Sequence, residues 1–176
     1  MLTRTSKVIA SSLRLCSVAG GLVLLLGCIQ AHPDDVERDD IPDCATTDLA
    51  VMRAEDFFAG ADPWVPAEDR PEDGETVAVV GWPRGGLLCT QLGCSFDCCD
   101  NSCGFMGDCA YSLEAGHPSN QVCLSHEDFA CGGTDCSPYC RPFGRDPRHQ
   151  YRFVGEVFYE DGPDPIIRVK DYCREG

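Results

Sequence analysis

Basic residues are scarce in this chain of 176 residues, in which 14 Lys and Arg oppose 29 Asp and Glu and leave a formal net charge of −15. A protein that binds nucleic acid through the phosphate backbone needs a basic stripe, so this composition argues against a nucleic-acid partner. Long apolar runs are also missing, because none reaches the roughly 18–20 residues of a membrane-spanning helix. The length allows one domain, or one domain with a tail.

Sequence motifs of the common enzyme classes are absent as well. There is no Gly-x-Ser-x-Gly, no His-Glu-x-x-His and no Gly-rich phosphate loop. Ser125, His126 and Glu127 include the residue types of a catalytic triad, but a triad is a spatial arrangement that chain neighbours do not form. We therefore predict that the protein is not an enzyme, has no catalytic residue and no cofactor, and uses its histidines as polar surface residues.

The first 27 residues differ from the rest of the chain, with three basic residues and no acidic one. Residues 15–26 are almost entirely apolar and small. A basic start followed by a short apolar stretch is typical of a secretory signal, and the stretch is too short for a stable membrane anchor. We therefore predict that residues 1–27 are a signal peptide.

The apolar stretch ends in Leu25-Leu26-Gly27-Cys28, which resembles the lipobox of bacterial lipoproteins. The resemblance covers residues 1–28 and implies that the signal is cut before Cys28. It also implies that the Cys28 thiol carries a diacylglyceryl group and that the new amino terminus is acylated. Several acyl chains hold a protein stably on a membrane, so the membrane becomes a partner through the lipid on Cys28.

The residue after the cysteine influences sorting in this family. Ile29 is not the aspartate associated with retention in the inner membrane, so the resemblance favours a location in the cell envelope, at the outer membrane. Ordinary secretion is the alternative, with cleavage after Ala31 and release of a soluble protein.

The mature chain, residues 28–176, keeps all 29 acidic residues and 11 of the basic ones, a charge of −18. Residues 28–43 combine proline with clustered acid, a composition that stays solvated. We expect this segment to be a lipidated acidic tether. Residues 44–176 are expected to form one disulfide-rich β domain.

Cysteine is plentiful, since 14 in 176 residues is about 8%, near the level of a disulfide scaffold. Cys16 leaves with the signal and Cys28 carries lipid, so an even number remains, and an oxidising compartment favours six disulfides. Cys44 and Cys173, near the two ends of the domain, are candidates to join a terminal segment to its body. The cysteines expected to form disulfides are Cys44, Cys89, Cys94, Cys98, Cys99, Cys103, Cys109, Cys123, Cys131, Cys136, Cys140 and Cys173.

Two cysteine spacings also fit a structural zinc site, Cys94-x3-Cys98 and Cys136-x3-Cys140. Oxidation after export competes with metal binding, so we predict that these thiols form disulfides and that no metal is bound. A thiol oxidoreductase is not expected, because it prefers a Cys-x-x-Cys pair beside a thioredoxin-like βαβ pattern.

Four side chains with oxygen atoms lie among the cysteines, and an irregular calcium site built from them is an alternative interpretation. The EF-hand frame fails, because Cys99 takes its third position. Turn residues between disulfides are the simpler interpretation. The four side chains are those of Asp97, Asp100, Asn101 and Asp108.

The clearest predicted elements are one helix and two hairpins. Residues 49–58, after a Thr-Thr-Asp cap, predict a short helix. Residues 76–80 and 87–90 flank a strong turn and predict a hairpin. Residues 151–159 and 166–173 alternate in polarity around a Gly-Pro turn and predict a second hairpin, with a bulge at Gly155.

The expected fold is mainly β, a small disulfide-rich β domain with one short N-terminal helix, similar to uncharacterised Cys-rich secreted domains. Two hairpins that flank a cysteine block also resemble, in layout, a five-stranded OB-like barrel over residues 75–173. The apolar side chains expected to line its interior are Val77, Val79, Leu88, Phe153, Val157, Ile167 and Val169.

Three functions remain open. The first is a surface-displayed binding or interaction module for a glycan, a peptide or another envelope protein, with Trp82 and Tyr151 as its exposed aromatic surface. The second is a purely structural envelope lipoprotein. The third is a secreted enzyme without a recognisable motif, which a concave cleft with close His and carboxylate groups would indicate. We expect the binding module.

Overall fold

The computed structural model describes residues 32–61, 70–90, 101–105, 109–115, 117–135, 137–160 and 164–176. The predicted signal peptide and Cys28 lie outside these residues, as do Cys94, Cys98, Cys99 and Cys136. The described chain is mainly β with one short helix, which confirms the predicted fold class. No helix within the described ranges is long and apolar enough to cross a bilayer.

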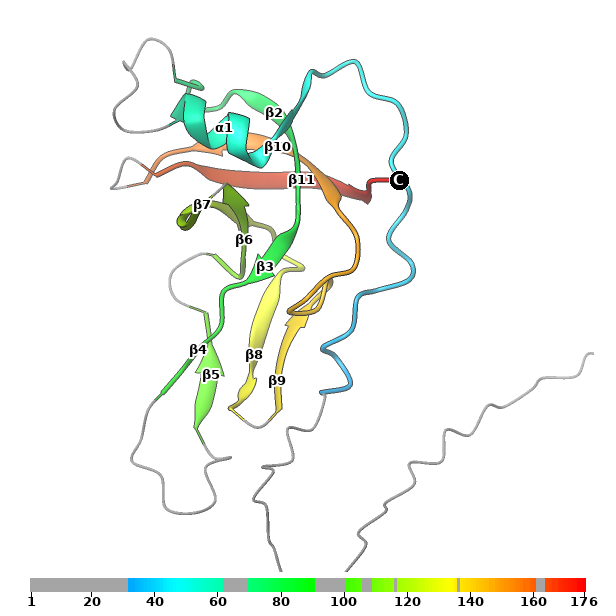
Figure 1. Cartoon of the computed structure of the whole chain (residues 1–176), viewed down its shortest axis with the longest axis vertical. Helices are drawn as coiled ribbons and strands as arrows, with labels where there is room; N and C mark the ends of the chain where they lie inside the picture. Colours follow the sequence, from blue (N-terminus) through cyan, green and yellow to red (C-terminus); the bar gives the residue numbers. More distant parts are fainter. Residues whose placement is uncertain are drawn as a thin grey trace, which may run out of the picture.

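The strands form two sheets, which follow one another along the longest axis of the molecule (Figure 1). The larger sheet contains β1 (Val51–Arg53), β2 (Thr76–Gly81), β3 (Pro83–Gly85), β6 (Tyr111–Ala115), β7 (His117–Ser125), β10 (Tyr151–Phe158) and β11 (Ile166–Arg174). The smaller sheet contains β4 (Leu88–Cys89), β5 (Ser102–Gly104), β8 (Ala130–Thr134) and β9 (Ser137–Arg141). Their strand orders are β1-β2-β10-β11-β7-β6-β3 and β4-β5-β8-β9.

Neither sheet closes into a barrel, so the OB-like expectation is wrong. The chain passes from one sheet to the other after β3, β5, β7 and β9, and this divides between two open sheets the strands that a barrel would need. Leu88 was expected inside the barrel, but it lies on β4, at the edge of the smaller sheet, and is 53% exposed. The other expected interior positions are buried.

The C-terminal hairpin is confirmed, because β10 and β11 pair in antiparallel register along their length. The register shifts between Val154 and Gly155, where the sequence predicts a bulge. A side chain does not fit at Gly155, because a Cβ there would overlap the carbonyl oxygen of Arg168. Buried and half-buried side chains alternate along β10, so one face of the hairpin packs on the core.

The predicted hairpin between residues 76–80 and 87–90 is wrong. β2 pairs with β1 on one side and with β10 on the other, so both of its edges are occupied. β4 pairs with β5 instead, where Cys89 lies opposite Cys103 and is bonded to it. β10 wins this competition because it can form a long backbone ladder with β2, which a two-residue strand cannot.

The helix begins later than predicted. Residues 51–53 form β1, parallel to β2, and the helix α1 spans Ala54–Ala61. Acidic side chains in its first turn stabilise the helix, because they lie near the positive end of its dipole. Ala54, Phe57 and Ala61 are buried and hold α1 against the larger sheet, at the upper end of the molecule in Figure 1.

An aromatic cluster fills the core around Phe143, which comes from the loop between β9 and β10. Its ring centroid lies between 4.6 and 5.6 Å from five other rings, mostly edge to face, the geometry that aromatic pairs prefer. The Tyr111 hydroxyl fixes this loop, because it donates to the carbonyl of Gly144 and accepts the N–H of Phe143. The partner rings belong to Tyr111, Phe129, Tyr151, Phe153 and Tyr172.

Four disulfides join the described residues, so the domain is disulfide-rich. The candidate pair at the two ends of the domain does bond and ties the N-terminal segment to β11. Two of the other bonds join residues that face each other directly in antiparallel strands. The pairs are Cys44–Cys173, Cys89–Cys103, Cys109–Cys123 and Cys131–Cys140.

The Cys131–Cys140 disulfide joins β8 and β9 of the smaller sheet and lies in the hydrophobic core, where this sheet contacts the larger one. Its sulfur atoms pack against Gly85, the last residue of β3 in the larger sheet. A Cβ at Gly85 would overlap Cys140 Sγ and lie 3.1 Å from Cys140 Cβ. Glycine at this position therefore lets a strand of one sheet pass close to the disulfide of the other.

Candidate functional site

The aromatic surface expected at Trp82 and Tyr151 is not formed. Tyr151 is fully buried, because the first residue of β10 faces the core, and its hydroxyl donates to Glu37. Trp82 is 43% exposed between β2 and β3. Tyr151 therefore cannot touch a partner, and its ring stabilises the fold instead.

Residues 32–44, which we call the N-terminal strap, lie against the domain. We expected the part before residue 44 to stay solvated, and this is wrong for Asp35, whose side chain is only 10% exposed. Its Oδ1 accepts the backbone N–H groups of Cys140 at 3.2 Å and Arg145 at 3.0 Å. Its Oδ2 accepts the Nε–H of Arg145 at 2.6 Å. Composition misses this arrangement, because the partners are more than a hundred residues away in sequence.

Glu37 is the second carboxylate of the strap whose side chain is only 10% exposed. It accepts the Tyr151 hydroxyl and the backbone N–H of Arg148 at 3.0 Å, and it lies 2.8 Å from Nδ1 of His149. Burial alone would raise the pKa of Glu37, but the contacts with Tyr151, His149 and Arg148 outweigh burial and lower this pKa. Burial raises the pKa of Tyr151 well above its ordinary value, and the Glu37 carboxylate adds to this effect.

The far end of the strap joins the C-terminal strand. The N–H of Arg174 donates to the carbonyl of Pro42 at 2.7 Å, and the N–H of Cys44 donates to the carbonyl of Arg174 at 2.9 Å. The Cys44–Cys173 disulfide closes the same junction, and Ile41 is buried beside it. The strap is thus held by carboxylates at one end and by backbone bonds and a disulfide at the other.

A cavity of about 270 Å³, which we call the His126 pocket, opens where β7, β10 and β11 come together. The parallel pairing of β7 with β11 brings Ser125 opposite Arg168. The antiparallel hairpin brings Phe158 opposite Ile166. The pocket is lined by Phe105, Ala110, Ser125, His126, Phe129, Phe158, Glu160, Ile166 and Arg168.

Arg168 is the main charged feature of the pocket. Its guanidinium lies over the Phe158 ring, 4.5 Å from the centroid, a cation–π contact. Glu156 lies opposite Arg168 in the ladder, but its carboxylate binds Lys170 instead. Within the described part of the chain, Arg168 forms no ion pair with a carboxylate, although Glu160 lines the same cavity.

His126 is held by its own turn and by two rings. Its Nδ1 accepts the backbone N–H of Asp128 at 3.1 Å, so the neutral ring carries its proton on Nε2. The ring packs against Phe129 and Tyr172, with centroids 5.0 and 5.5 Å away. Among the described residues, no side-chain hydroxyl donates to His126.

Described residues also line two further cavities. One of about 280 Å³ shares His126 with the His126 pocket and is lined on its other side by the strap, at Arg38 and Asp40. The other, of about 450 Å³, lies where the chain passes from β3 to β4, beside the Cys109–Cys123 disulfide. Asp164 is its only charged lining residue among those described, so it offers less polar recognition than the His126 pocket.

No metal site is found in the described part of the chain, where no group of three or more His, Cys, Asp or Glu could hold an ion. Asn101 is one of the four residues considered for a calcium site, and its side-chain amide donates a hydrogen bond to Asp135 Oδ2 at 2.9 Å. Asp97, Asp100 and Asp108 lie outside the described residues.

The sequence has no match among protein-family models, and a search of curated proteins finds no relative. The site must therefore be interpreted from its chemistry. Sequence reasoning did not single out Phe158, Glu160 or Arg168. A signal was present in the predicted C-terminal hairpin, because antiparallel pairing brings the end of its first strand beside the start of its second.

Proposed function

We propose that the mature protein is a lipid-anchored binding module of the cell envelope and that it binds a small ligand in the His126 pocket. The observation that carries this proposal is Arg168, a cation without a carboxylate partner among the described residues of a strongly acidic protein. It stands over an aromatic ring at the wall of a cavity. Cavities with apolar walls and a few polar groups are the usual ligand sites of proteins.

The lining residues indicate the class of ligand. The guanidinium of Arg168 suits a carboxylate, because its planar fork can form two parallel hydrogen bonds. Glu160, exposed at the same cavity, suits an amine. Phe105, Phe129 and Ile166 offer apolar surface for a side chain. A ligand with all three features is a free apolar amino acid.

Three compounds separate these contributions. Phenylalanine carries both charges, N-acetylphenylalanine keeps only the carboxylate, and phenylalaninamide keeps only the amine. We expect purified mature protein to bind phenylalanine most tightly in calorimetric titrations. Arg168→Gln should weaken the binding of both carboxylate compounds at least tenfold, about 1.4 kcal/mol, and should leave phenylalaninamide nearly unchanged.

Arg141 provides the matched control, because it is an exposed arginine outside the pocket. Arg141→Gln changes the net charge by the same amount and should leave all three affinities unchanged. Equal losses in both variants would mean that overall charge, rather than the pocket, determines binding. If none of the compounds binds at millimolar concentration, the pocket proposal is wrong, and a purely structural envelope protein becomes the better hypothesis.

The anchoring part of the proposal is supported by Leu25-Leu26-Gly27-Cys28 and has its own experiment. Cys28→Ser should abolish labelling with radioactive palmitate and leave uncleaved precursor in the membrane fraction. Cys16→Ser, which changes the other cysteine of the N-terminal region, should be labelled and cleaved normally. Normal cleavage of the Cys28→Ser chain, with release of soluble protein, would indicate secretion with cleavage after Ala31.

A further inference from the structure

We infer that the docked strap holds the β8–β9 end of the domain against the membrane surface. The inference rests on the proposed lipidation of Cys28 and adds to it a distance and an orientation. The described chain begins beside the lower part of β9 in Figure 1, where the ring of His32 stacks on Tyr139 with centroids 4.5 Å apart. The first described contact of the chain with the domain thus lies at this end of the molecule.

The number of residues between Cys28 and His32 sets an upper limit on the distance between the lipid and the domain. His32 is four residues after Cys28, and an extended chain spans at most about 3.3–3.6 Å per residue, so the reach is about 14 Å. If the whole strap were free, the 16 residues from Cys28 to Cys44 would reach about 55 Å. The shorter reach applies, because the hydrogen bonds of Asp35 and Glu37 fix the strap to the loop after β9.

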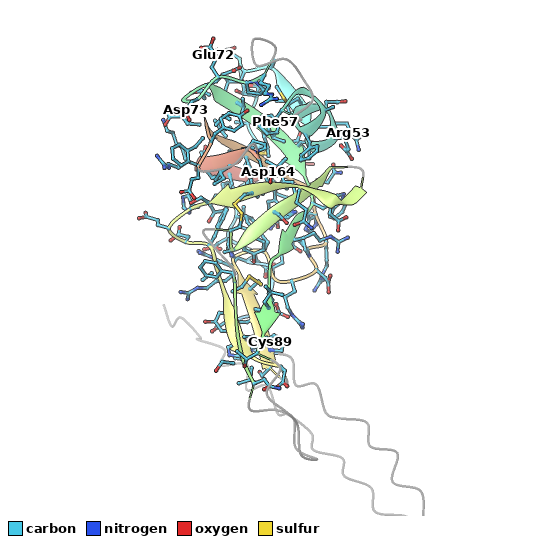
Figure 2. The ribbon with its side chains drawn as sticks, turned by 90° about the vertical axis from the view of Figure 1, so that its left-hand side faces the viewer. Arg53, Phe57, Glu72, Asp73, Cys89 and Asp164 are labelled. Atoms are coloured by element: carbon cyan, nitrogen blue, oxygen red, sulfur yellow. A yellow bond between two sulfur atoms is a disulfide. The ribbon has the colours of Figure 1, made fainter. Side chains whose placement is uncertain are left out.

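The same geometry decides which surface faces the lipid. β8 and β9 belong to the smaller sheet, and Cys89 of β4 marks the same end of the molecule in Figure 2. α1 and β1 lie at the opposite end, with Arg53 and Phe57 near the top of Figure 2. The smaller sheet therefore faces the membrane, and α1 points away from it.

Electrostatic attraction does not explain this position. The mature chain has a charge of −18, so an anionic surface repels it within the screening length of about 8–10 Å. A short covalent connection holds the domain in spite of that repulsion. A long flexible tether would let the domain move away from the surface.

Paramagnetic broadening measures both the distance and the orientation. Mature lipidated protein is placed in nanodiscs that carry a gadolinium-chelating lipid, and amide signals are recorded by NMR. We expect broadening at the tip of the β8–β9 hairpin, at Thr134 and Ser137, and none at Phe57. A ten-residue Gly-Ser insertion between Gln30 and Ala31 should remove the broadening without changing the fold.

Asp35→Asn combined with Glu37→Gln should weaken the broadening at the hairpin, because it releases the strap. Asp39→Asn combined with Asp48→Asn is the control, since it makes the same charge change at exposed side chains. Melting curves confirm that each variant is folded, and the insertion variant tests the inference even if the strap variant unfolds. Broadening at Phe57, or none that depends on the insertion, overturns the inference while the proposed lipidation stands. Protein that does not stay on the nanodisc overturns both.

Discussion

Asp35 binds Arg145 through both of its carboxylate oxygens, one to the backbone N–H at 3.0 Å and the other to the side-chain Nε–H at 2.6 Å. The two residues are 110 positions apart in sequence. A carboxylate that accepts N–H groups of a remote loop is part of the fold, although composition places it in a tether. The strap is therefore an integral piece of the domain.

Replacing this carboxylate should destabilise the protein. Asp35→Asn removes the ion pair with Arg145 and leaves a buried amide group where an acceptor is needed. We expect the free energy of unfolding to fall by about 1–3 kcal/mol. Urea denaturation followed by circular dichroism measures the change. Asp39→Asn, at an exposed strap position, should stay within about 0.5 kcal/mol of the parent protein.

Glu37 should make the stability depend on acid pH. Its pKa is below the ordinary value of 4.5 in the folded protein, so the charged form binds better there than in the unfolded chain. Its contribution is fully present above pH 4.5 and is lost as the pH falls through the folded pKa. Melting temperatures between pH 7 and pH 3 should show the parent protein approaching Glu37→Gln as the pH falls. A gap that stays constant would mean that the carboxylate charge contributes nothing.

Gly85 should not tolerate a larger residue. In Gly85→Ala the new methyl group overlaps Cys140 Sγ at the junction of the two sheets, and overpacking of this kind costs about 1–3 kcal/mol. Gly104→Ala is the control, because nothing lies within 4 Å of its added Cβ. Thermal unfolding of the two oxidised variants compares them directly. Equal melting temperatures would show that the sheets move apart freely at this point.

The Cys44–Cys173 disulfide should stabilise the folded protein strongly, because it closes a long loop. It closes a loop of 129 residues, and changing both cysteines to alanine should cost about 2–5 kcal/mol. Hydrogen exchange should then show that the strap and the end of β11 open first, before the rest of the sheet. Full reduction of the parent protein should unfold it near room temperature. A cooperative melt in the presence of reductant would show that packing alone is sufficient.

The sequence correctly predicted those elements whose residues interact with near neighbours in the chain. The alternation around Gly155 gave the hairpin and its bulge, since both strands are adjacent in sequence and one face is buried. The even number of cysteines that follows the predicted signal peptide indicated a disulfide scaffold. The buried state of Val79 and Ile167 was also predicted, because each lies in a run of apolar, strand-forming residues.

Long-range competition decided the features that the sequence did not predict. β2 seemed a partner for residues 87–90 because they are close in sequence, but β10 offers it a longer ladder. Tyr151 looked like an exposed aromatic, and only the fold shows that it faces Glu37. The candidate pocket combines His126 with the turn end of the C-terminal hairpin. The meeting of β7, β10 and β11 at this point cannot be predicted from residue spacing, because it depends on contacts between distant parts of the chain.

The position of the C-terminal hairpin in the larger sheet has a consequence for how the chain can fold. β10 and β11 come after the other described strands in sequence, yet they separate β2 from β7 at the centre of the sheet. The facing edges of β2 and β7 therefore stay unpaired, and Cys44 lacks its partner Cys173, until residues 151–174 are available. Pairings between distant strands form slowly. In the meantime the waiting thiol can bond a wrong cysteine, and thiol–disulfide exchange must then reverse that bond before the sheet can close.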